Sequence, residues 1–228
     1  MKRLAALLVC AVACPAASAF AADWSGPYVG AGIGPFLGES RWTPRGPLTP
    51  FPDLPVSMDL DGALLSGKLG YRLQANRWVF GVEADYARGG VDGSAPCLGN
   101  ATPVICTLEL RSQLKLTGQI GYASGPWLPY LSFGYAQASG RASVFDPIDG
   151  PALAGGGTHR GGLVGVGLDY RISRWVSVGL EYQHIWYGSD AYALLPGSGP
   201  ATLGPSSTKI AIDPDYVGIN VKVRLDGN

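Results

Sequence analysis

The amino-acid sequence predicts an all-β fold, an eight-stranded antiparallel up-and-down transmembrane β-barrel. Three observations support this prediction. Only 15% of the 228 residues are charged, while glycine (34 residues) and aromatic residues (10%) are frequent, and this composition favours strands over helices. Eight segments alternate apolar and polar residues with a period of two, which is the period of a β-strand. The breaks between these segments are alternately short and long, as they are in outer-membrane barrels.

The chain begins with the features of a secretory signal peptide. A positive start at Met1-Lys2-Arg3 is followed by ten apolar residues, Leu4 to Ala13, which are too few to cross a bilayer. Ala19-Phe20-Ala21 provides a cleavage site with small residues, and cleavage after Ala19 is the alternative. We therefore expect a signal peptide at residues 1–21 and a single barrel domain at residues 22–228.

The cysteines indicate one disulfide bond. A lipoprotein signal acting through Cys14 is disfavoured, because Ala11 stands where such a signal has leucine and Pro15 would follow the modified cysteine. The mature chain keeps Cys97 and Cys106, nine residues apart, and an oxidising compartment favours a local disulfide between them.

Charge and composition argue against nucleic acid, metal and cofactor partners. The chain has 17 basic and 17 acidic residues, so loss of Lys2 and Arg3 leaves 15 against 17, a net charge of −2. A net negative charge does not favour binding to the phosphates of nucleic acid. Besides the cysteines, the only imidazole ligands are His159 and His184, so we expect no metal and no cofactor.

Each predicted strand has one apolar and one polar face. The strands cover Tyr28–Gly34 and residues 62–74, 77–88, 107–122, 127–139, 159–172, 175–187 and 216–225. In chain order, the apolar faces carry Val29 and Ile33; Leu65, Leu69 and Leu73; Trp78, Phe80 and Val82; Leu108, Leu110, Leu114 and Leu116; Leu131 and Phe133; Val164, Val166 and Leu168; Val176, Val178 and Leu180; and Val217, Ile219, Val221 and Val223.

The lengths of the breaks between strands indicate which end of the barrel is periplasmic and which is extracellular. Short breaks at 75–76, 123–126 and 173–174 predict periplasmic turns, whereas long breaks at 35–61, 89–106, 140–158 and 188–208 predict four extracellular loops. Aromatic residues near both ends predict two interfacial girdles. Trp78, Tyr122, Trp127 and Tyr170 lie beside the short turns, and Tyr86, Tyr135 and Trp186 lie near the long loops.

Five sequence blocks carry a family resemblance. They are Trp24–Gly32 (WSGPYVGAG), Trp78–Glu83 (WVFGVE), Leu128–Tyr130 (LPY), Gly165–Tyr170 (GVGLDY) and Val178–Tyr182 (VGLEY). In order and spacing the chain resembles the small opacity-protein-like, porin-family outer-membrane β-barrels of Gram-negative bacteria, over residues 24–225. The resemblance implies location in the cell outer membrane, contact with outer-membrane lipid and lipopolysaccharide, and assembly by the barrel insertion machinery. The family's last strand normally ends on an aromatic residue, whereas this one ends on Val223-Arg224-Leu225.

The lumen-facing side of the strands predicts an ionic network. An eight-stranded barrel has room inside only for side chains, and buried charges are costly unless they pair. A turn centred on residues 75–76 would place Lys68 opposite Glu83, and a turn centred on 124–125 would place Lys115 opposite Gly134. The predicted network consists of Lys68, Arg72, Glu83, Asp85, Glu109, Arg111, Lys115, Asp169, Arg171, Glu181, Lys222 and Arg224.

The sequence offers no catalytic constellation. His184, Ser189 and Asp190 come nearest to a hydrolase set, but His184 and Ser189 are an odd number of residues apart and would face opposite sides of a strand. We expect a surface barrel with a structural, envelope-integrity and surface-interaction role and a plugged lumen. A small diffusion channel and a lipid-A-modifying enzyme are the alternatives. The sequence does not identify a ligand for the extracellular loops.

Overall fold

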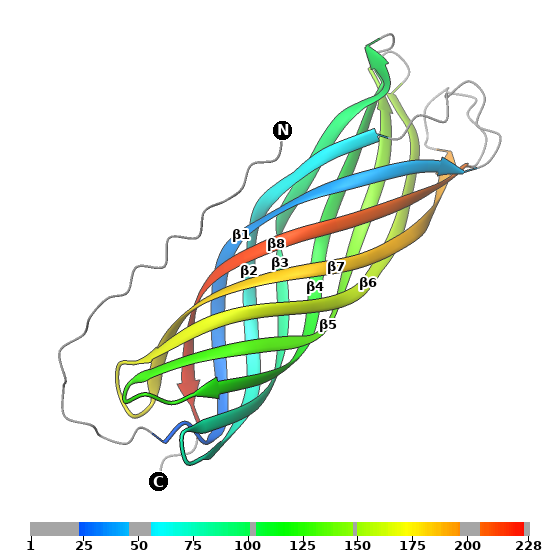
Figure 1. The fold of residues 1–228 in the computed structure, drawn as a ribbon. Helices are drawn as coiled ribbons and strands as arrows, with labels where there is room; N and C mark the ends of the chain where they lie inside the picture. Colours follow the sequence, from blue (N-terminus) through cyan, green and yellow to red (C-terminus); the bar gives the residue numbers. More distant parts are fainter. Residues whose placement is uncertain (1–22, 46–55, 101–103, 148–149, 197–205, 226–228) are drawn as a thin grey trace.

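The protein folds as a closed β-barrel of eight strands. The structure, a computed structural model, describes residues 23–45, 56–100, 104–147, 150–196 and 206–225, so the predicted signal peptide lies outside the described residues. Every strand pairs antiparallel with its sequence neighbours, and β8 pairs with β1 (Figure 1). The predicted fold class is confirmed. The strands are β1 (Gly26–Arg45), β2 (Val56–Ala75), β3 (Trp78–Asn100), β4 (Ile105–Tyr122), β5 (Trp127–Asp146), β6 (Gly150–Arg171), β7 (Val176–Pro196) and β8 (Ser206–Arg224).

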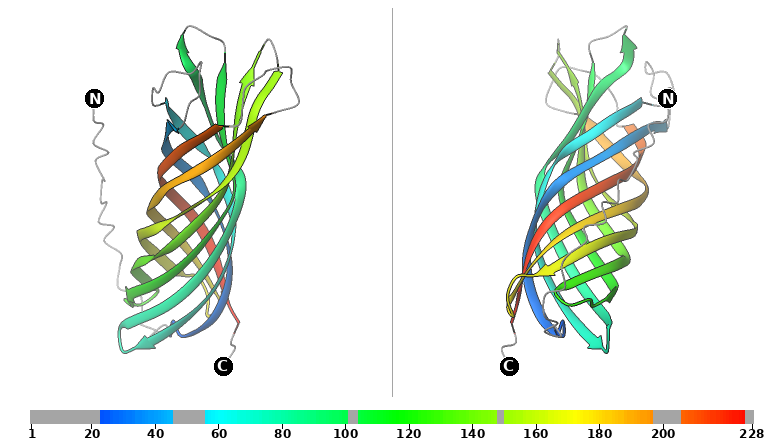
Figure 2. Two further views of the ribbon diagram at one scale, coloured as in Figure 1. Left: turned by 90° about the vertical axis from the view of Figure 1, so that its right-hand side faces the viewer. Right: turned by 60° about the vertical axis from the view of Figure 1, so that its left-hand side comes forward.

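The strands are longer than predicted. They contain 18 to 23 residues each, and much of the sequence predicted as external loop is strand. β1 continues to Arg45 and β2 starts at Val56, for example, within the predicted loop 35–61. Figure 2 shows that the paired ends of β3 and β4, and of β5 and β6, project farthest at the end opposite the short turns. About ten residues suffice for a tilted strand to cross a bilayer, so the barrel extends well beyond the hydrocarbon.

The outer surface carries a band of large apolar side chains. Leu65 is 65% exposed, Phe133 58% and Ile219 62%, which fits contact with lipid hydrocarbon. At the short-turn end, the rings of Trp78 and Tyr122 lie 5.5 Å apart between centroids. In the described residues, no helix is long and apolar enough to span a membrane.

Tight turns close the strand pairs at one end. The turn between Ala75 and Trp78 contains Asn76 at a φ of 58°, a left-handed conformation that asparagine tolerates better than most residues. Gly125 adopts the same φ of 58° in the turn between β4 and β5. Both β1 and β8 have an end on this side of the barrel (Figure 1).

Two predicted registers were wrong by two residues. Lys68 pairs with Asp85 and not with Glu83, because the turn is centred on Asn76 and Arg77. Lys115 pairs with Ala136 and not with Gly134. The expected pattern of a long charged chain opposite a very small residue nevertheless holds for Lys115.

A β-bulge reverses the facing of β4 at its outer end. The register of β4 against β5 shifts between Leu110 and Ser112. Leu108 and Leu110 were predicted to face lipid, but they are buried in the barrel interior. Their neighbours Glu109 and Arg111 point outward. An inserted residue changes the side to which all following side chains point, which explains the reversal.

The barrel interior has two halves of different chemistry. Toward the short turns it holds buried charged residues such as Lys68 and Asp169. Toward the outer end it holds one apolar cluster, which includes Phe36, Leu108 and Ile185. The strand extensions beyond the lipid band are therefore held together by an apolar core of their own.

Candidate functional site

The candidate site is a group of eight charged side chains in the inner half of the barrel nearer the short turns. All of them are at most 4% exposed. They come from six of the eight strands, at positions that share the inward face. Four are cationic (Lys68, Arg72, Lys115 and Lys222) and four are carboxylates (Glu83, Asp85, Asp169 and Glu181), so their formal charges cancel.

Lys68 lies at the centre of this network. Its Nζ contacts Oδ2 of Asp85 at 2.5 Å, Oε1 of Glu181 at 2.8 Å and Oε1 of Glu83 at 3.2 Å. Asp85 lies on the neighbouring strand β3, whereas Glu181 lies on β7, which is not a neighbour of β2. The contact between Lys68 and Glu181 therefore crosses the lumen.

Asp169 is the second centre. Its Oδ2 lies 2.8 Å from Nη2 of Arg72 and 2.9 Å from Nζ of Lys222. Arg72 is on β2 and Asp169 on β6, so this pair also joins opposite walls of the barrel. Lys222 additionally approaches Oε2 of Glu83 at 3.6 Å, which connects the two centres.

Amide and hydroxyl groups form hydrogen bonds with the charged side chains of the network. Gln119 accepts a hydrogen bond from Nη2 of Arg72 at 3.0 Å, and Gln183 accepts one from Nζ of Lys115 at 2.8 Å. The Tyr28 hydroxyl donates to Oε2 of Glu83 at 2.8 Å. Buried charges of this kind are tolerated only where such partners are present.

Two tyrosines sandwich the cations. The guanidinium carbon of Arg72 lies 5.0 Å from the ring centroid of Tyr28 and 5.5 Å from that of Tyr130. These rings fill space over glycines, because a Cβ at Gly70 would lie 2.3 Å from the Tyr28 ring and one at Gly167 would lie 2.2 Å from the Tyr130 ring. Glycine is therefore required at both positions for the rings to lie across the lumen.

Four residues of the predicted network lie elsewhere. Glu109 and Arg111 were predicted to face the lumen, and this prediction was wrong because of the bulge in β4. They form an exposed pair on the outer wall, with 3.6 Å between Oε2 and Nη2. Arg171 and Arg224 lie at the short-turn mouth, where both Nη1 atoms donate to the backbone carbonyl of Asp23.

The residues that sequence reasoning missed are neutral. Gln119, Gln183 and Tyr28 were not assigned to the network, because the search for lumen residues followed formal charge alone. Gln119 and Gln183 share the inward face with Lys115 and Glu181 on their strands. The facing pattern therefore contained the signal that could have found them.

The hydrolase candidates do not come together. Nδ1 of His184 lies 2.8 Å from Oδ1 of Asp215 on the outer wall, and the Tyr182 hydroxyl donates to the same oxygen at 2.7 Å. Asp190 instead accepts hydrogen bonds from the backbone N–H groups of Thr158 and Ala191. No group of three or more metal-ligating side chains occurs within the described ranges.

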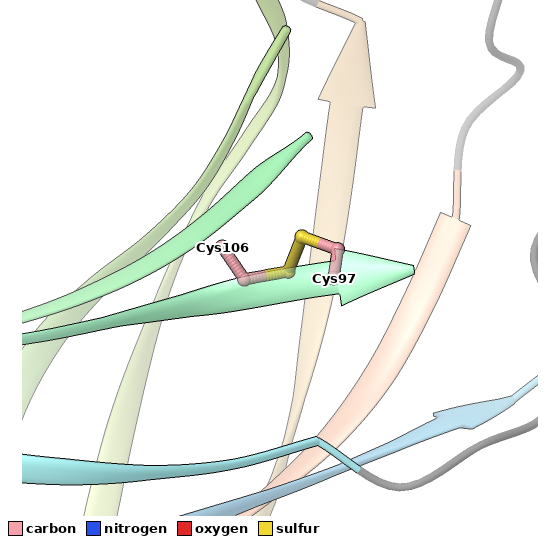
Figure 3. The surroundings of a disulfide bond; sticks show 2 residues. All are labelled: Cys97 and Cys106. Carbon is pink, nitrogen blue, oxygen red and sulfur yellow. A yellow bond between two sulfur atoms is a disulfide. The ribbon is translucent and has the colours of Figure 1, made fainter. Parts of the chain in front are cut away.

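Cys97 and Cys106 form a disulfide at the outer end of the paired strands β3 and β4 (Figure 3). Their Cα atoms lie 5.3 Å apart. The bond was predicted for a long external loop, but both residues are part of strands. Cys106 of β4 pairs with Ala95 of β3, two residues before Cys97.

Comparisons with known proteins agree with this architecture. Residues 4–224 match the family described as outer membrane protein beta-barrel domain. The chain is 27% identical to outer membrane protein P1 of Coxiella burnetii over 94% of its own length and 92% of that protein. Two solved structures share the fold. Outer membrane protein OprG of Pseudomonas aeruginosa has a TM-score of 0.54 at 15% identity, covering 89% of this chain and 97% of OprG. Outer membrane protease OmpT of Escherichia coli has a TM-score of 0.55 at 9% identity, covering 88% and 97%.

Proposed function

Because the chain belongs to the outer membrane protein β-barrel domain family, we propose that this outer-membrane protein is a closed surface barrel with a structural, envelope-integrity role. It acts neither as a diffusion channel nor as an enzyme. The observation that carries the proposal is the pair of ionic contacts across the lumen, Lys68 with Glu181 and Arg72 with Asp169.

The ionic network supports a plug for two reasons. It joins opposite walls through two contacts, Lys68 with Glu181 and Arg72 with Asp169, so several ion pairs would have to break before a continuous column of water could form. It is also electrically balanced, and removal of one partner would leave an uncompensated buried charge. A many-stranded barrel leaves an aqueous channel, whereas an eight-stranded one has space only for such side chains.

Above the plug, the apolar cluster adds a second barrier. Phe36, Leu108 and Ile185 belong to it, and each is at most 1% exposed. A permeating ion would have to leave water to pass this segment, which costs many kcal/mol.

Planar bilayer recordings test the closed lumen. The purified protein should show at most rare, small conductance events. Glu83→Ala removes a carboxylate from the plug and should raise their frequency, whereas Glu109→Ala, which removes the same group from the outer wall, should leave the recordings unchanged. Steady, ion-selective currents from the unmutated protein would contradict the proposal and favour a channel.

A lipid-modifying activity is the second candidate function, and one observation favours it. His184 and Asp215 form a hydrogen-bonded pair on the outer wall, beside the ring of Trp186 at 4.6 Å. Such a pair could activate a nucleophile. A lipid A hydrolysis assay on the unmutated protein and on His184→Ala separates the two functions, because the structural role predicts no turnover by either.

The outer wall of the barrel indicates which membrane components contact the protein. We propose that the apolar band contacts outer-membrane lipid and that lipopolysaccharide surrounds the outer wall. Exposed arginines are available there for its phosphates, namely Arg88, Arg111, Arg141 and Arg160. We further propose that the barrel insertion machinery assembles the chain, although β8 carries no aromatic residue at its end.

A further inference from the structure

The outer wall of the barrel has a hollow over β2, β3 and β4. Its volume is about 610 Å³, which is in the range of cavities that bind a small molecule or part of a larger one. The outward-facing residues that line it are Leu69, Tyr71, Val82, Ala84, Leu116 and Gly118. None of them is charged, so the hollow belongs to the apolar band and faces the hydrocarbon of the membrane.

Differences in side-chain size produce the hollow. Ala84 on β3 pairs with Leu69 on one side and with Leu116 on the other. These two leucines are 59% and 51% exposed, so they project from the wall on both sides of a small residue. Gly67, which pairs with Tyr86, is the next outward position of β2 toward the outer end, and a Cβ there would meet no heavy atom within 4 Å. The hollow therefore continues as a groove toward the outer end of the barrel.

An arginine is held in position at the outer end of this groove. Along β3, Tyr86 and then Arg88 are the outward-facing residues that follow Ala84. Nε of Arg88 donates to the Tyr86 hydroxyl at 2.7 Å, and the guanidinium carbon lies 5.4 Å from the centroid of the Tyr86 ring. Arg88 forms no salt bridge with any of the described residues, so its Nη groups are available to a ligand.

The spacing of Arg88 and the hollow fits one leaflet of a membrane. Val82 precedes Arg88 by six residues, which is about 20 Å of strand. A strand tilted by about 45° descends about 14 Å over this length, which is close to half of a hydrocarbon core about 30 Å thick. An acyl chain that starts from a headgroup at Arg88 therefore ends in the hollow.

The other end of β3 is less suited to hold such a headgroup. Arg77 lies seven residues from Ala84, whereas Arg88 lies four residues from it. Nη1 of Arg77 already donates to the Tyr122 hydroxyl at 3.1 Å. The groove also runs from Ala84 toward the outer end, which favours a lipid of the outer leaflet over one of the periplasmic leaflet.

We propose that this groove binds one lipopolysaccharide molecule, with an acyl chain in the hollow and a lipid A phosphate at Arg88. A guanidinium group matches the geometry of a phosphate and binds it through charge-assisted hydrogen bonds. Space for a bulky headgroup is present above Arg88, because a Cβ at Gly90 would meet no heavy atom within 4 Å. The site rests on the proposed contact of the outer wall with lipopolysaccharide, and it specifies where one molecule is held.

Titration of the folded protein in detergent micelles with bisphosphorylated lipid A tests the site by NMR. The Nε–H signal of Arg88 and the methyl signals of Leu69 and Leu116 should shift saturably with one common midpoint. Lipid A without its phosphates should bind at least about tenfold more weakly. Arg88→Gln should weaken the binding of intact lipid A by a similar factor, which is the value of one charge-assisted hydrogen bond.

Two pairs of variants separate the two parts of the site. Arg77→Gln is the control for Arg88→Gln, because it removes an exposed arginine from the periplasmic end of the barrel and should leave binding unchanged. Ala84→Leu fills the hollow and should weaken binding about threefold or more, because the acyl chain loses its van der Waals contacts there. Val166→Leu is its control, since it adds a leucine to the outer face of β6, outside the hollow, and should have no effect.

Several results would overturn the proposal. They include the absence of a saturable shift, equal binding of lipid A without phosphates, and equal losses in Arg77→Gln and Arg88→Gln. Binding of phosphatidylglycerol that depends on Arg77 and not on Arg88 would assign the hollow to a phospholipid of the periplasmic leaflet. Methyl shifts that grow with protein concentration in the absence of lipid would assign it to a second copy of the chain.

Failure of this site is distinguishable from failure of the proposed function. Saturable shifts at Arg160 without shifts at Arg88 would overturn this site and would retain a contact between lipopolysaccharide and the outer wall. The closed lumen is tested by conductance, which none of these titrations measures.

Discussion

Nζ of Lys68 on β2 lies 2.8 Å from Oε1 of Glu181 on β7, and the two residues meet across the middle of the barrel. Their strands are not adjacent, so no backbone hydrogen bond holds these walls at this distance. Ionic side chains therefore contribute to the closed shape of the barrel as well as to its closed lumen.

Glu83→Ala should destabilise the barrel by about 3–5 kcal/mol, because Lys68, Lys222 and Tyr28 all lose a buried partner. Urea unfolding in lipid vesicles, followed by tryptophan fluorescence, measures this. Glu109→Ala is the control, and its exposed pair with Arg111 should contribute less than about 1 kcal/mol. Similar losses in both variants would mean that the network does not stabilise the barrel.

Leu116→Arg and Leu195→Arg should differ sharply, although both leucines point outward, 51% and 61% exposed. Leu116 lies in the apolar band, where arginine costs about 2–4 kcal/mol near the bilayer centre. Leu195 lies near the outer end of β7, beyond the band, where arginine meets water. The same unfolding assay compares them, and an equal cost would show that the membrane position is misassigned.

The disulfide should stabilise the outer strand ends more than the barrel as a whole. Closing a loop of about ten residues contributes roughly 2–3 kcal/mol in the chain-entropy model. Hydrogen exchange in Cys97→Ser should therefore accelerate at the ends of β3 and β4 and remain unchanged around Lys68. Mass spectrometry of the mature protein gives the direct check, since two freely alkylated thiols without reductant would rule the bond out.

The N-terminal segment at the mouth should loosen in acid. Burial raises the pKa of Asp23, but hydrogen bonds from the Ser25 N–H and hydroxyl, together with Arg224 and Arg171, outweigh it and leave the pKa below 3.8. The folded state thus favours the ionised carboxylate of Asp23. The stabilisation that this carboxylate provides is present above pH 3.8 and is lost as the pH falls through the lowered pKa. Trp24 fluorescence should report release below about pH 4. Asp23→Asn should remove this dependence, and an unchanged acid transition in that variant would assign it to another group.

The alternation of residues along each strand predicted the eight strands and the face on which most side chains lie, and the alternating short and long breaks between the strands then indicated an outer-membrane barrel. A period of two places Lys68 and Arg72 on the opposite face from Leu69, whatever the neighbouring strands do. The same rule found the eight members of the network, because a narrow lumen accepts charge only where charges can pair. The lipid-facing leucines and valines follow from the other face.

Only the tertiary structure decided which of these residues meet. The exact pairing of Lys68 depends on a turn centred on Asn76 and Arg77. A register shift of two residues leaves every side chain on the same face of the sheet, so the alternation of residues does not reveal the register. The bulge between Leu110 and Ser112 moved Glu109 and Arg111 from the predicted lumen to the outer wall. Contacts across the lumen, such as Lys68 with Glu181, depend on closure of the whole barrel. Strand periodicity is a property of neighbouring residues, whereas register, bulges and closure are set by the packing of all eight strands together.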